Sequence, residues 1–512
     1  MAGLFLLILR TGYLYADSNS PIVDTPSGKV KGIRVDVDGL AGAKTVQFRG
    51  IPFAKPPVGD LRFEKPQPVR PWNETKDASV FGPSCVQPFD KLLPYKNLFP
   101  NLKISEDCLV LNIYAPNDVD NQRNKTVMVW IHGGGYVIGQ GMFYDPSYMA
   151  VKGDVIVVTI NYRLGVFGFA TLKNEILKGN YGLWDQIEAL KWIKQNIYAF
   201  GGDTNSITIF GESAGGFSVS LLALIPSNKG LFHRVIAQSG VASSIFATAF
   251  TEPNYTLSIG KQVGCNDKDP KAFVNCLKGM SADLLPNVTK AFDNVIPDVI
   301  HILGTSAPVV DNEVLTDLPE NLLKNTKSDA CQFFKSLDIM FGNVKTEGSL
   351  ILGVFTPVVQ NMFNFNGSIG LPYDVFCDNI VKTLVNDYFS GISAVKDAIC
   401  TEYGVRYDQG MQGMGAVDMF TDLFFMSVGV STLRNHALSN PNVKRYQYIF
   451  TKEDKITSTR PSWFHGASHG NELPYLFDLR RLPALLNVSL TSYDLILSDK
   501  MIAYWTNFAK TG

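Results

Sequence analysis

The sequence lacks the charge bias, the metal-binding cysteine pairs and the long apolar runs that mark several common classes of protein. Its 512 residues carry a formal net charge of −1, so no basic excess favours nucleic acid and no charge run favours a membrane surface. None of its seven cysteines forms a Cys-x-x-Cys pattern, which disfavours a zinc site. Past the N-terminus no apolar run is long enough to span a bilayer. With 46% hydrophobic and 18% charged residues, the composition is that of an ordinary globular protein.

The N-terminus differs from the rest of the chain. The apolar run at 4–9 and the small residue Ala16 predict a secretory signal over residues 1–16, although Arg10 interrupts the apolar stretch and no basic residue precedes it. We therefore expect a secreted or extracellular protein, without an integral membrane segment. Six candidate glycosylation sequons add weak support: Asn73, Asn124, Asn254, Asn287, Asn366 and Asn487.

The cysteines also favour secretion. Cys85 and Cys108 enclose a short loop rich in polar residues or proline, and so do Cys265 and Cys276, as surface disulfides often do. The odd count leaves at least one free thiol, and spacing alone does not pair the cysteines. The remaining cysteines are Cys331, Cys377 and Cys400.

Apolar runs without alternation predict strands that are buried on both faces. Such runs lie at 108–114, 126–131 and 155–160, and further strands are predicted at 206–209, 235–238, 337–342 and 445–450. Leu183, Ile187 and Leu190 recur at helical spacing between two of them. The order predicts an α/β fold with a large, mostly parallel central sheet covered by helices on both faces. Alternation at 29–37 and the return at 44–48 add a small N-terminal antiparallel sheet.

No clean domain boundary appears, so we interpret residues 17–512 as a single α/β domain with insertions. The pattern loosens into short helices and loops between residues 242 and 329. Residues 350–440 are expected to be helical, with glycine-rich breaks between Gly404 and Gly415.

The stretch Gly211–Glu212–Ser213–Ala214–Gly215 stands between a β-branched run and an apolar helical pattern. A serine in Gly-x-Ser-x-Gly at a strand-to-helix turn is typical of a nucleophile on a sharp, strained turn. The motif is short enough to arise by chance, so a base, an acid and donors for an oxyanion must come from elsewhere in the chain.

A second glycine-rich stretch, His132–Gly133–Gly134–Gly135, follows a predicted buried strand. Consecutive glycines allow backbone N–H groups to approach a substrate oxygen, as in the oxyanion loops of esterases and lipases. We predict that the N–H groups of Gly134, Gly135 and Ala214 form the oxyanion hole.

The base must be one of six histidines. His132 and His233 flank motif strands and are interpreted as structural, and His301 and His436 lack a following glycine turn. His465 and His469 lie in one loop after the last predicted strand, and position barely separates them.

The acid is expected in a loop after a strand that follows Ser213. Glu347 fits this position, Asp311 is the other contender, and Asp338 is less able to reach the sheet edge because it lies within its strand.

Together these motifs resemble the type-B carboxylesterases, which include the cholinesterases, over residues 23–512. The motifs that carry the resemblance are residues 48–54, 106–109, 132–135, 161–163, 211–215 and 466–470. The resemblance implies an α/β-hydrolase fold with Ser213 as nucleophile, Glu347 as acid and His469, not His465, as base. It also implies the disulfides Cys85–Cys108 and Cys265–Cys276 and an ion pair between Arg49 and Glu106.

The resemblance implies a serine carboxylic ester hydrolase that needs no metal or cofactor and acts on a small-molecule ester. Cholinesterases hold choline on a tryptophan in the loop between the first two cysteines, but residues 86–107 contain only Phe89, Tyr95 and Phe99 as aromatics, which disfavours a choline ester. A catalytically silent adhesion protein and a lipase remain the alternatives on this fold. Family members usually continue past the equivalent of Gly512, which leaves open that the chain is a fragment.

Overall fold

A large twisted sheet forms the centre of the protein. The computed structural model describes residues 20–88, 102–117, 124–249, 253–265, 268–284, 306–353, 357–437, 442–453, 460–477, 479–481 and 489–512. Within them, nine strands are ordered β12-β11-β10-β9-β7-β8-β6-β4-β3. The strands are β3 Ile33–Asp36, β4 Lys44–Pro52, β6 Val110–Pro116, β7 Lys125–Ile131, β8 Ile156–Ile160, β9 Gly202–Glu212, β10 Arg234–Gln238, β11 Asp338–Val344 and β12 Arg445–Phe450. From β8 to β12 neighbours run parallel, and β6, β4 and β3 continue antiparallel.

The central strands are buried on both faces, as their apolar runs predict. Along β7, Val127, Val129 and Ile131 belong to one core cluster. Met128 and Trp130, which alternate with them, belong to a second cluster on the opposite face. The two clusters explain why the run shows no polar positions, and they confirm the predicted large, mostly parallel sheet.

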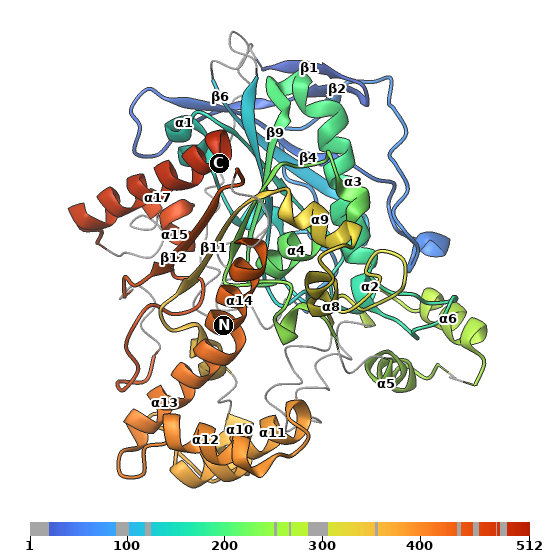
Figure 1. Ribbon diagram of the computed structural model, residues 1–512. Helices are drawn as coiled ribbons and strands as arrows, with labels where there is room; N and C mark the ends of the chain where they lie inside the picture. The colour runs from blue at the N-terminus through green and yellow to red at the C-terminus, as the bar shows by residue number, and fades with distance from the viewer. Residues whose placement is uncertain are drawn as a thin grey trace.

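Helices cover both faces of this sheet (Figure 1). On one face lie α3 (Tyr181–Asn196) and α4 (Ala214–Leu222), whose apolar residues join the cluster around Val129. On the other lie α1 (Ser147–Gly153) and α17 (Ser492–Thr511), whose apolar residues join the cluster around Trp130. The helix predicted from the Leu183, Ile187 and Leu190 spacing is confirmed as α3.

The N-terminal hairpin prediction is only partly right. The run at 29–37 is split at Gly32, where a Cβ would lie 2.5 Å from the carbonyl oxygen of Gln47. β3 after the split pairs with β4 in the large sheet. β2 (Gly28–Lys31) before it pairs antiparallel with β1 (Ile22–Thr25) and parallel with β5 (Lys76–Asp77), so the small separate sheet is mixed.

Short helices fill the insertions after β8 and β10. They are α2 Gly165–Phe169, α5 Asn254–Gln262, α6 Pro270–Gly279, α8 Pro319–Lys324 and α9 Asp329–Lys335. Single 3₁₀ turns occur along the chain at Gly59–Leu61, Gly141–Phe143, Ile197–Phe200, Pro226–Asn228 and Ile245–Ala247. A short helix, α15 (Leu473–Leu476), and the 3₁₀ turn Leu479–Arg481 precede α17.

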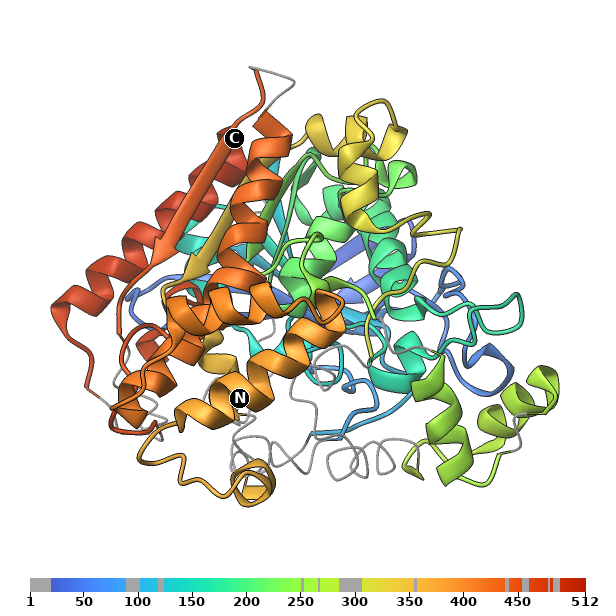
Figure 2. The same cartoon turned by 60° about the horizontal axis from the view of Figure 1, so that its bottom comes forward.

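A helical layer formed by residues 357–437 comes forward in Figure 2. It contains α10 Pro357–Met362, the π-helical turn η9 Val375–Val381, α11 Lys382–Tyr388, α12 Ser393–Tyr403, α13 Gln409–Thr421, the π-helical turn η10 Asp422–Met426 and α14 Ser427–Ala437. In the described part of the chain, the continuous helix 409–437 is the one long and apolar enough to cross a membrane, and half of its most apolar window is buried in the fold.

The predicted glycine break between Gly404 and Gly415 is wrong over most of its length, because α13 runs through Gly410, Gly413 and Gly415. A Cβ on Gly413 would lie 2.7 Å from the ring of Trp463, and one on Gly415 would lie 2.2 Å from the carbonyl oxygen of Tyr403. These glycines allow close packing rather than ending the helix.

Disulfides join Cys85 to Cys108 and Cys265 to Cys276, the pairs that the resemblance implies. A further bond joins Cys377 in η9 to Cys400 in α12, and Cys331 is a buried free thiol. Disulfides of this number are typical of proteins from oxidising compartments.

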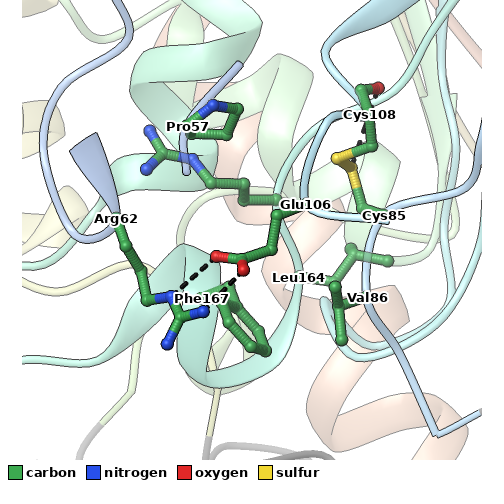
Figure 3. A pocket seen from close by; sticks show the side chains of 9 residues that line it. Pro57, Arg62, Cys85, Val86, Glu106, Cys108, Leu164 and Phe167 are labelled. Atoms are coloured by element: carbon green, nitrogen blue, oxygen red, sulfur yellow. Dashed lines mark hydrogen bonds and ion pairs between the residues drawn. A yellow bond between two sulfur atoms is a disulfide. The ribbon is translucent and has the colours of Figure 1, made fainter. Parts of the chain in front are cut away.

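The predicted ion pair between Arg49 and Glu106 is wrong, since Glu106 pairs with Arg62 instead (Figure 3). Arg62 holds the two carboxylate oxygens through Nε at 2.7 Å and Nη2 at 2.6 Å. Its Nη1 donates to the carbonyl oxygens of Leu277 at 3.0 Å and Met280 at 2.7 Å, at the C-terminal end of helix α6. The Arg62 guanidinium thus connects the loop enclosed by the Cys85–Cys108 disulfide to helix α6, which contains Cys276 of the Cys265–Cys276 disulfide.

Arg49 has other partners. Its Nε and Nη2 donate to Gln47 Oε1 at 2.9 and 2.6 Å, and its guanidinium lies 4.5 Å from the centre of the Phe81 ring. Arg49 lies in β4, and Arg62 follows the 3₁₀ turn Gly59–Leu61. Both come after β3, so only the three-dimensional path of the chain decides which arginine contacts Glu106.

We expect a double-mutant cycle to separate the two arginines. Arg62→Met and Glu106→Gln should couple by about 1–3 kcal/mol in the free energy of unfolding, because each leaves the other partner buried and unpaired. Arg49→Met and Glu106→Gln should add within about 0.5 kcal/mol. Urea unfolding followed by tryptophan fluorescence measures both cycles, and equal coupling of the two arginines would contradict the assignment.

Candidate active site

Ser213 occupies a strained turn between β9 and α4. Its backbone has φ 57° and ψ −122°, in the left-handed half of conformational space that residues other than glycine rarely adopt. The N–H of Ser213 donates to the carbonyl oxygen of Gln238 at 2.9 Å, and the carbonyl oxygen of Ser213 accepts from the N–H of Phe217 at 2.8 Å. The turn is therefore held by the end of β10 and by the first turn of α4.

Close packing around this turn demands the glycine that follows Ala214. A Cβ on Gly215 would lie 2.0 Å from the carbonyl oxygen of Ile131, at the end of β7. The absence of a side chain lets α4 start directly against that strand. Ser213 itself stays partly exposed, as a nucleophile must be.

The loop 132–135 lies against the turn. A Cβ on Gly133 would lie 2.9 Å from Glu212 Oε2 and 3.2 Å from the Cβ of Ser213. Gly135, with φ 64°, has open space where a side chain would begin. Ala214 is the first residue of α4, so its N–H has no acceptor inside the helix. The loop that carries Gly134 and Gly135 thus approaches Ser213 through Gly133, while Ala214 follows Ser213 directly.

His132 is a structural residue of this loop. Its ring stacks on Tyr162 with centroids 4.4 Å apart, and its Nδ1 lies 2.9 Å from the carbonyl oxygen of Gly133. Complete burial lowers the pKa of His132 to about 4, so the ring is neutral at pH 7.

Glu347 and His469 are in direct contact. His469 Nδ1 lies 2.6 Å from Glu347 Oε2, and both side chains are buried. The other oxygen, Glu347 Oε1, accepts from the N–H of Val344 at 2.9 Å and from Asn343 Nδ2 at 3.2 Å. These bonds hold the carboxylate directly after β11, where the 3₁₀ helix η8 (Glu347–Gly353) begins.

The two loops that carry this pair are joined by their backbones. Thr346 donates to the carbonyl oxygen of Ala467 through its N–H at 3.1 Å and its hydroxyl at 2.6 Å. The N–H of His469 donates to Ser349 Oγ at 2.8 Å. The backbone that carries the imidazole is thus held independently of the contact between His469 and Glu347.

The opposite ring nitrogen faces the Ser213 turn. His469 Nε2 lies 3.0 Å from Oε1 of Glu212, the residue before Ser213. This contact has the distance of an ion pair without the angle of a hydrogen bond, and both atoms lack a hydrogen-bond partner among the described residues. No hydrogen bond between Ser213 Oγ and His469 occurs in that part of the chain, although such bonds often tighten only when substrate binds.

Three buried carboxylates surround His469. The third is Glu472, whose Oε1 accepts from Gln238 Nε2 at 3.1 Å. Burial, with the neighbouring carboxylates, raises the pKa of Glu212 and Glu472. Burial alone would lower the pKa of His469, but Glu212 first and Glu347 next outweigh it, so the pKa lies above its ordinary value.

The other candidate acids are engaged elsewhere. Asp311 Oδ1 accepts the N–H groups of Glu313, Val314 and Leu315 in its own loop. Asp338 is the first residue of β11, at the opposite end of that strand from Glu347, and it pairs with Arg234 at 3.3 Å. Of the three candidates for the acid, Glu347 alone contacts His469 in the structure.

The other described histidines have their contacts away from the Ser213 turn. His465 is exposed, with Nδ1 3.3 Å from the carbonyl oxygen of Trp463. His436 is buried against Leu337 and Arg445, and burial lowers its pKa to about 4. His233 lies beside the N–H of Ile207. His301 lies outside the described residues.

Three further residues near His469 were not predicted from the sequence. Glu212 stands within the motif around Ser213, and Glu472 follows the motif around His469 by two residues. Phe425 lies in the π-helical turn η10 with its ring 5.7 Å from the His469 ring, and Phe424 beside it contacts Phe246 at 5.1 Å. These aromatic rings give the site an apolar wall.

Four of the six sequons lie in the described residues. Asn73, Asn124, Asn254 and Asn366 are exposed, while Asn287 and Asn487 fall outside that part of the chain.

Comparisons with known proteins give one family. The model of the carboxylesterase family matches residues 19–512. Neuroligin-2 of Mus musculus is 34% identical over 528 residues, which cover 96% of this chain and 60% of that protein. Liver carboxylesterase 1F of Rattus norvegicus is 33% identical over 532 residues, which cover 99% of this chain and 89% of that protein. The chain therefore spans about 60% of the neuroligin and most of the liver enzyme.

We expect Glu212→Gln to lower the pKa of His469 by about one unit or more, because it removes a carboxylate 3.0 Å from Nε2. The wild-type imidazole should titrate above about 6.5, since a nearby negative charge favours the protonated ring. NMR titration of protein with ¹³C-labelled histidine measures both values. Glu188→Gln on α3 is the control, and an unchanged His469 titration in a folded Glu212→Gln protein would contradict the contact.

Proposed function

Because the chain belongs to the carboxylesterase family, we propose that it is a serine hydrolase of carboxylic esters. The observation that carries this proposal is the buried contact of 2.6 Å between His469 Nδ1 and Glu347 Oε2, with the other ring nitrogen facing the strained turn of Ser213. A base that is oriented by a carboxylate and placed at a nucleophile turn is the arrangement that acyl transfer needs.

In the first half of the reaction, His469 Nε2 takes the proton of the Ser213 hydroxyl while Oγ attacks the ester carbonyl carbon. The negative charge that forms on the carbonyl oxygen is stabilised by the N–H groups of Gly134, Gly135 and Ala214. The carbon–oxygen bond to the alcohol then breaks, the alcohol leaves with the proton from His469, and an acyl group remains on Ser213.

In the second half, water replaces the alcohol. His469 takes a proton from the water, whose oxygen attacks the acyl carbon. The bond between that carbon and Ser213 Oγ then breaks, His469 returns the proton to Oγ, and the acid leaves. Glu347 accepts the hydrogen bond of Nδ1–H throughout, so the lone pair of Nε2 points to the reacting atoms. The charge of Glu347 also stabilises the imidazolium that forms in each half.

The substrate that we propose is a small-molecule ester with an apolar acyl or alcohol group. Phe425 beside the His469 ring and the Phe246–Phe424 contact support an apolar binding wall. The prediction that choline esters are disfavoured concerns a loop of which residues 89–101 lie outside the described residues. A lipase remains an alternative, and long-chain against short-chain esters would distinguish it.

A catalytically silent adhesion protein is the second candidate. It is favoured by one observation, namely that the neuroligins are as similar in sequence as the liver carboxylesterase. The contact between His469 and Glu347 supports the enzyme instead, because an unused site would have no need to keep a buried charge oriented by three hydrogen-bonding groups.

We also propose that the protein acts in an extracellular or secretory compartment. The disulfides Cys85–Cys108, Cys265–Cys276 and Cys377–Cys400 support this location, as do the exposed sequons. The predicted signal at residues 1–16 lies outside the described residues.

Ser213→Ala should reduce kcat for a short p-nitrophenyl ester by about 10⁴-fold or more, because the nucleophile is lost while binding remains. An organophosphate should block the wild-type protein with one-to-one labelling. Ser239→Ala is the matched control, since Ser239 also has a positive φ of 52° and directly follows the neighbouring strand β10. Folded wild-type protein without esterase activity would contradict the enzyme and favour the adhesion protein.

We expect His469→Gln and His465→Gln to have very different effects on kcat, although both residues lie in one loop. We expect His469→Gln to lower kcat by about 10³-fold or more, since no other described histidine ring contacts the residues of the Ser213 turn. His465→Gln should remain within about twofold, because this ring is exposed and contacts a backbone carbonyl. Comparable losses in two folded variants would contradict the assignment of the base.

A further inference from the structure

Gln238, the last residue of β10, has three contacts that meet at the site. Its carbonyl oxygen accepts from the N–H of Ser213 at 2.9 Å. Its side-chain Nε2 lies 3.1 Å from Glu472 Oε1, and its Oε1 lies 2.9 Å from Trp505 Nε1 on α17. The side chain is completely buried, so water does not compete for these bonds.

Trp505 decides which way the amide points. An indole N–H only donates, so the amide atom that faces it must be the oxygen. The NH₂ group is then forced toward Glu472, and it can donate to that carboxylate but cannot accept from it. The O–H of a protonated Glu472 therefore finds no acceptor at this position, whereas an ionised Glu472 receives a hydrogen bond from the NH₂ group of Gln238.

The ionisation of Glu472 matters because of what surrounds it. Glu472 follows His469 by three residues and is buried, and its Oε2 has no hydrogen-bond partner among the described residues. The titratable groups that act on it or feel its charge are Glu212, Glu347, His469, Tyr144 and Tyr448. Burial raises the pKa of Glu472, while the Gln238 hydrogen bond lowers it. An ionised Glu472 in turn favours the protonated form of His469.

We propose that Gln238 is a positioning residue of the site, held by Trp505 as a donor to Glu472, and that through this carboxylate it sets the proton affinity of His469. The proposal rests on the ester hydrolase function for its kinetic consequence, but the proton affinity of His469 is a property of the folded protein alone. The C-terminal helix α17 thereby influences the base without contacting it.

Two variants test the proposal. Gln238→Met removes the donor at similar volume, and Trp505→Phe removes the indole N–H while keeping an aromatic ring, which frees the amide to turn its oxygen to a neutral Glu472. Both should raise the pKa of Glu472, and both should lower the pKa of His469 by about half a unit or more. The readouts are the NMR titration of ¹³C-labelled histidine, assigned with His469→Gln, and the acid limb of the kcat/KM profile, which should move to lower pH by the same amount.

Trp192→Phe is the control, because Trp192 is buried and its Nε1 has no partner among the described residues. It should leave the His469 titration within about 0.2 units of wild type. An unchanged titration in folded Gln238→Met and Trp505→Phe proteins, or an equal shift in Trp192→Phe, would overturn the proposal. An inactive wild-type protein would contradict the proposed function alone, since the NMR titration still reports the link from Gln238 to His469.

Discussion

The carboxyl edge of the parallel strands is the constraint on which the site depends. Strands β7, β9, β10 and β11 run parallel, so the segments that follow them leave the sheet at the same edge. Those segments carry the glycine loop at 132–135, Ser213 and Glu347, and Gln238 is the last residue of β10 at the same edge. Residues more than 200 positions apart along the chain therefore meet without any one loop having to be long. The loop after β12 adds His469, which completes the set.

Burial makes the charges of this edge interdependent. Glu212, Glu347 and Glu472 all lie around one imidazole with little solvent to screen them, so a proton on one changes the proton affinity of the others. Each carboxylate is also anchored differently. Glu347 is held by Asn343 and a backbone N–H, Glu472 by Gln238, and Glu212 by its place next to Ser213. The ionisation of Glu212 and of Glu472 therefore responds to the charge of the histidine.

The sequence predicted what depends on local pattern and missed what depends on the path of the chain. Buried runs located β7 and β8, and the glycine spacing around Ser213 located the turn, because burial on both faces and backbone strain leave marks in a few consecutive residues. The partner of Glu106 could not be predicted in this way, since Arg49 and Arg62 differ only in where the folded chain carries them. Cys377 and Cys400 are separated by 23 residues, as are Cys85 and Cys108, so spacing held no distinguishing signal.

The packing of the sheet and the chemistry of its edge share residues. Helix α17 buries Met501, Ile502 and Trp505 against the face that contains Trp130. It is further fixed where Arg234 at the start of β10 donates to the carbonyl oxygen of Ala509 at 3.0 Å. Trp505 contributes to both the core and the site. Its ring belongs to that core, while its N–H orients the side chain of Gln238 at the other end of β10. A substitution in this helix would therefore act on stability through the ring and on the site through the hydrogen bond, and only a change that separates ring from N–H distinguishes the two.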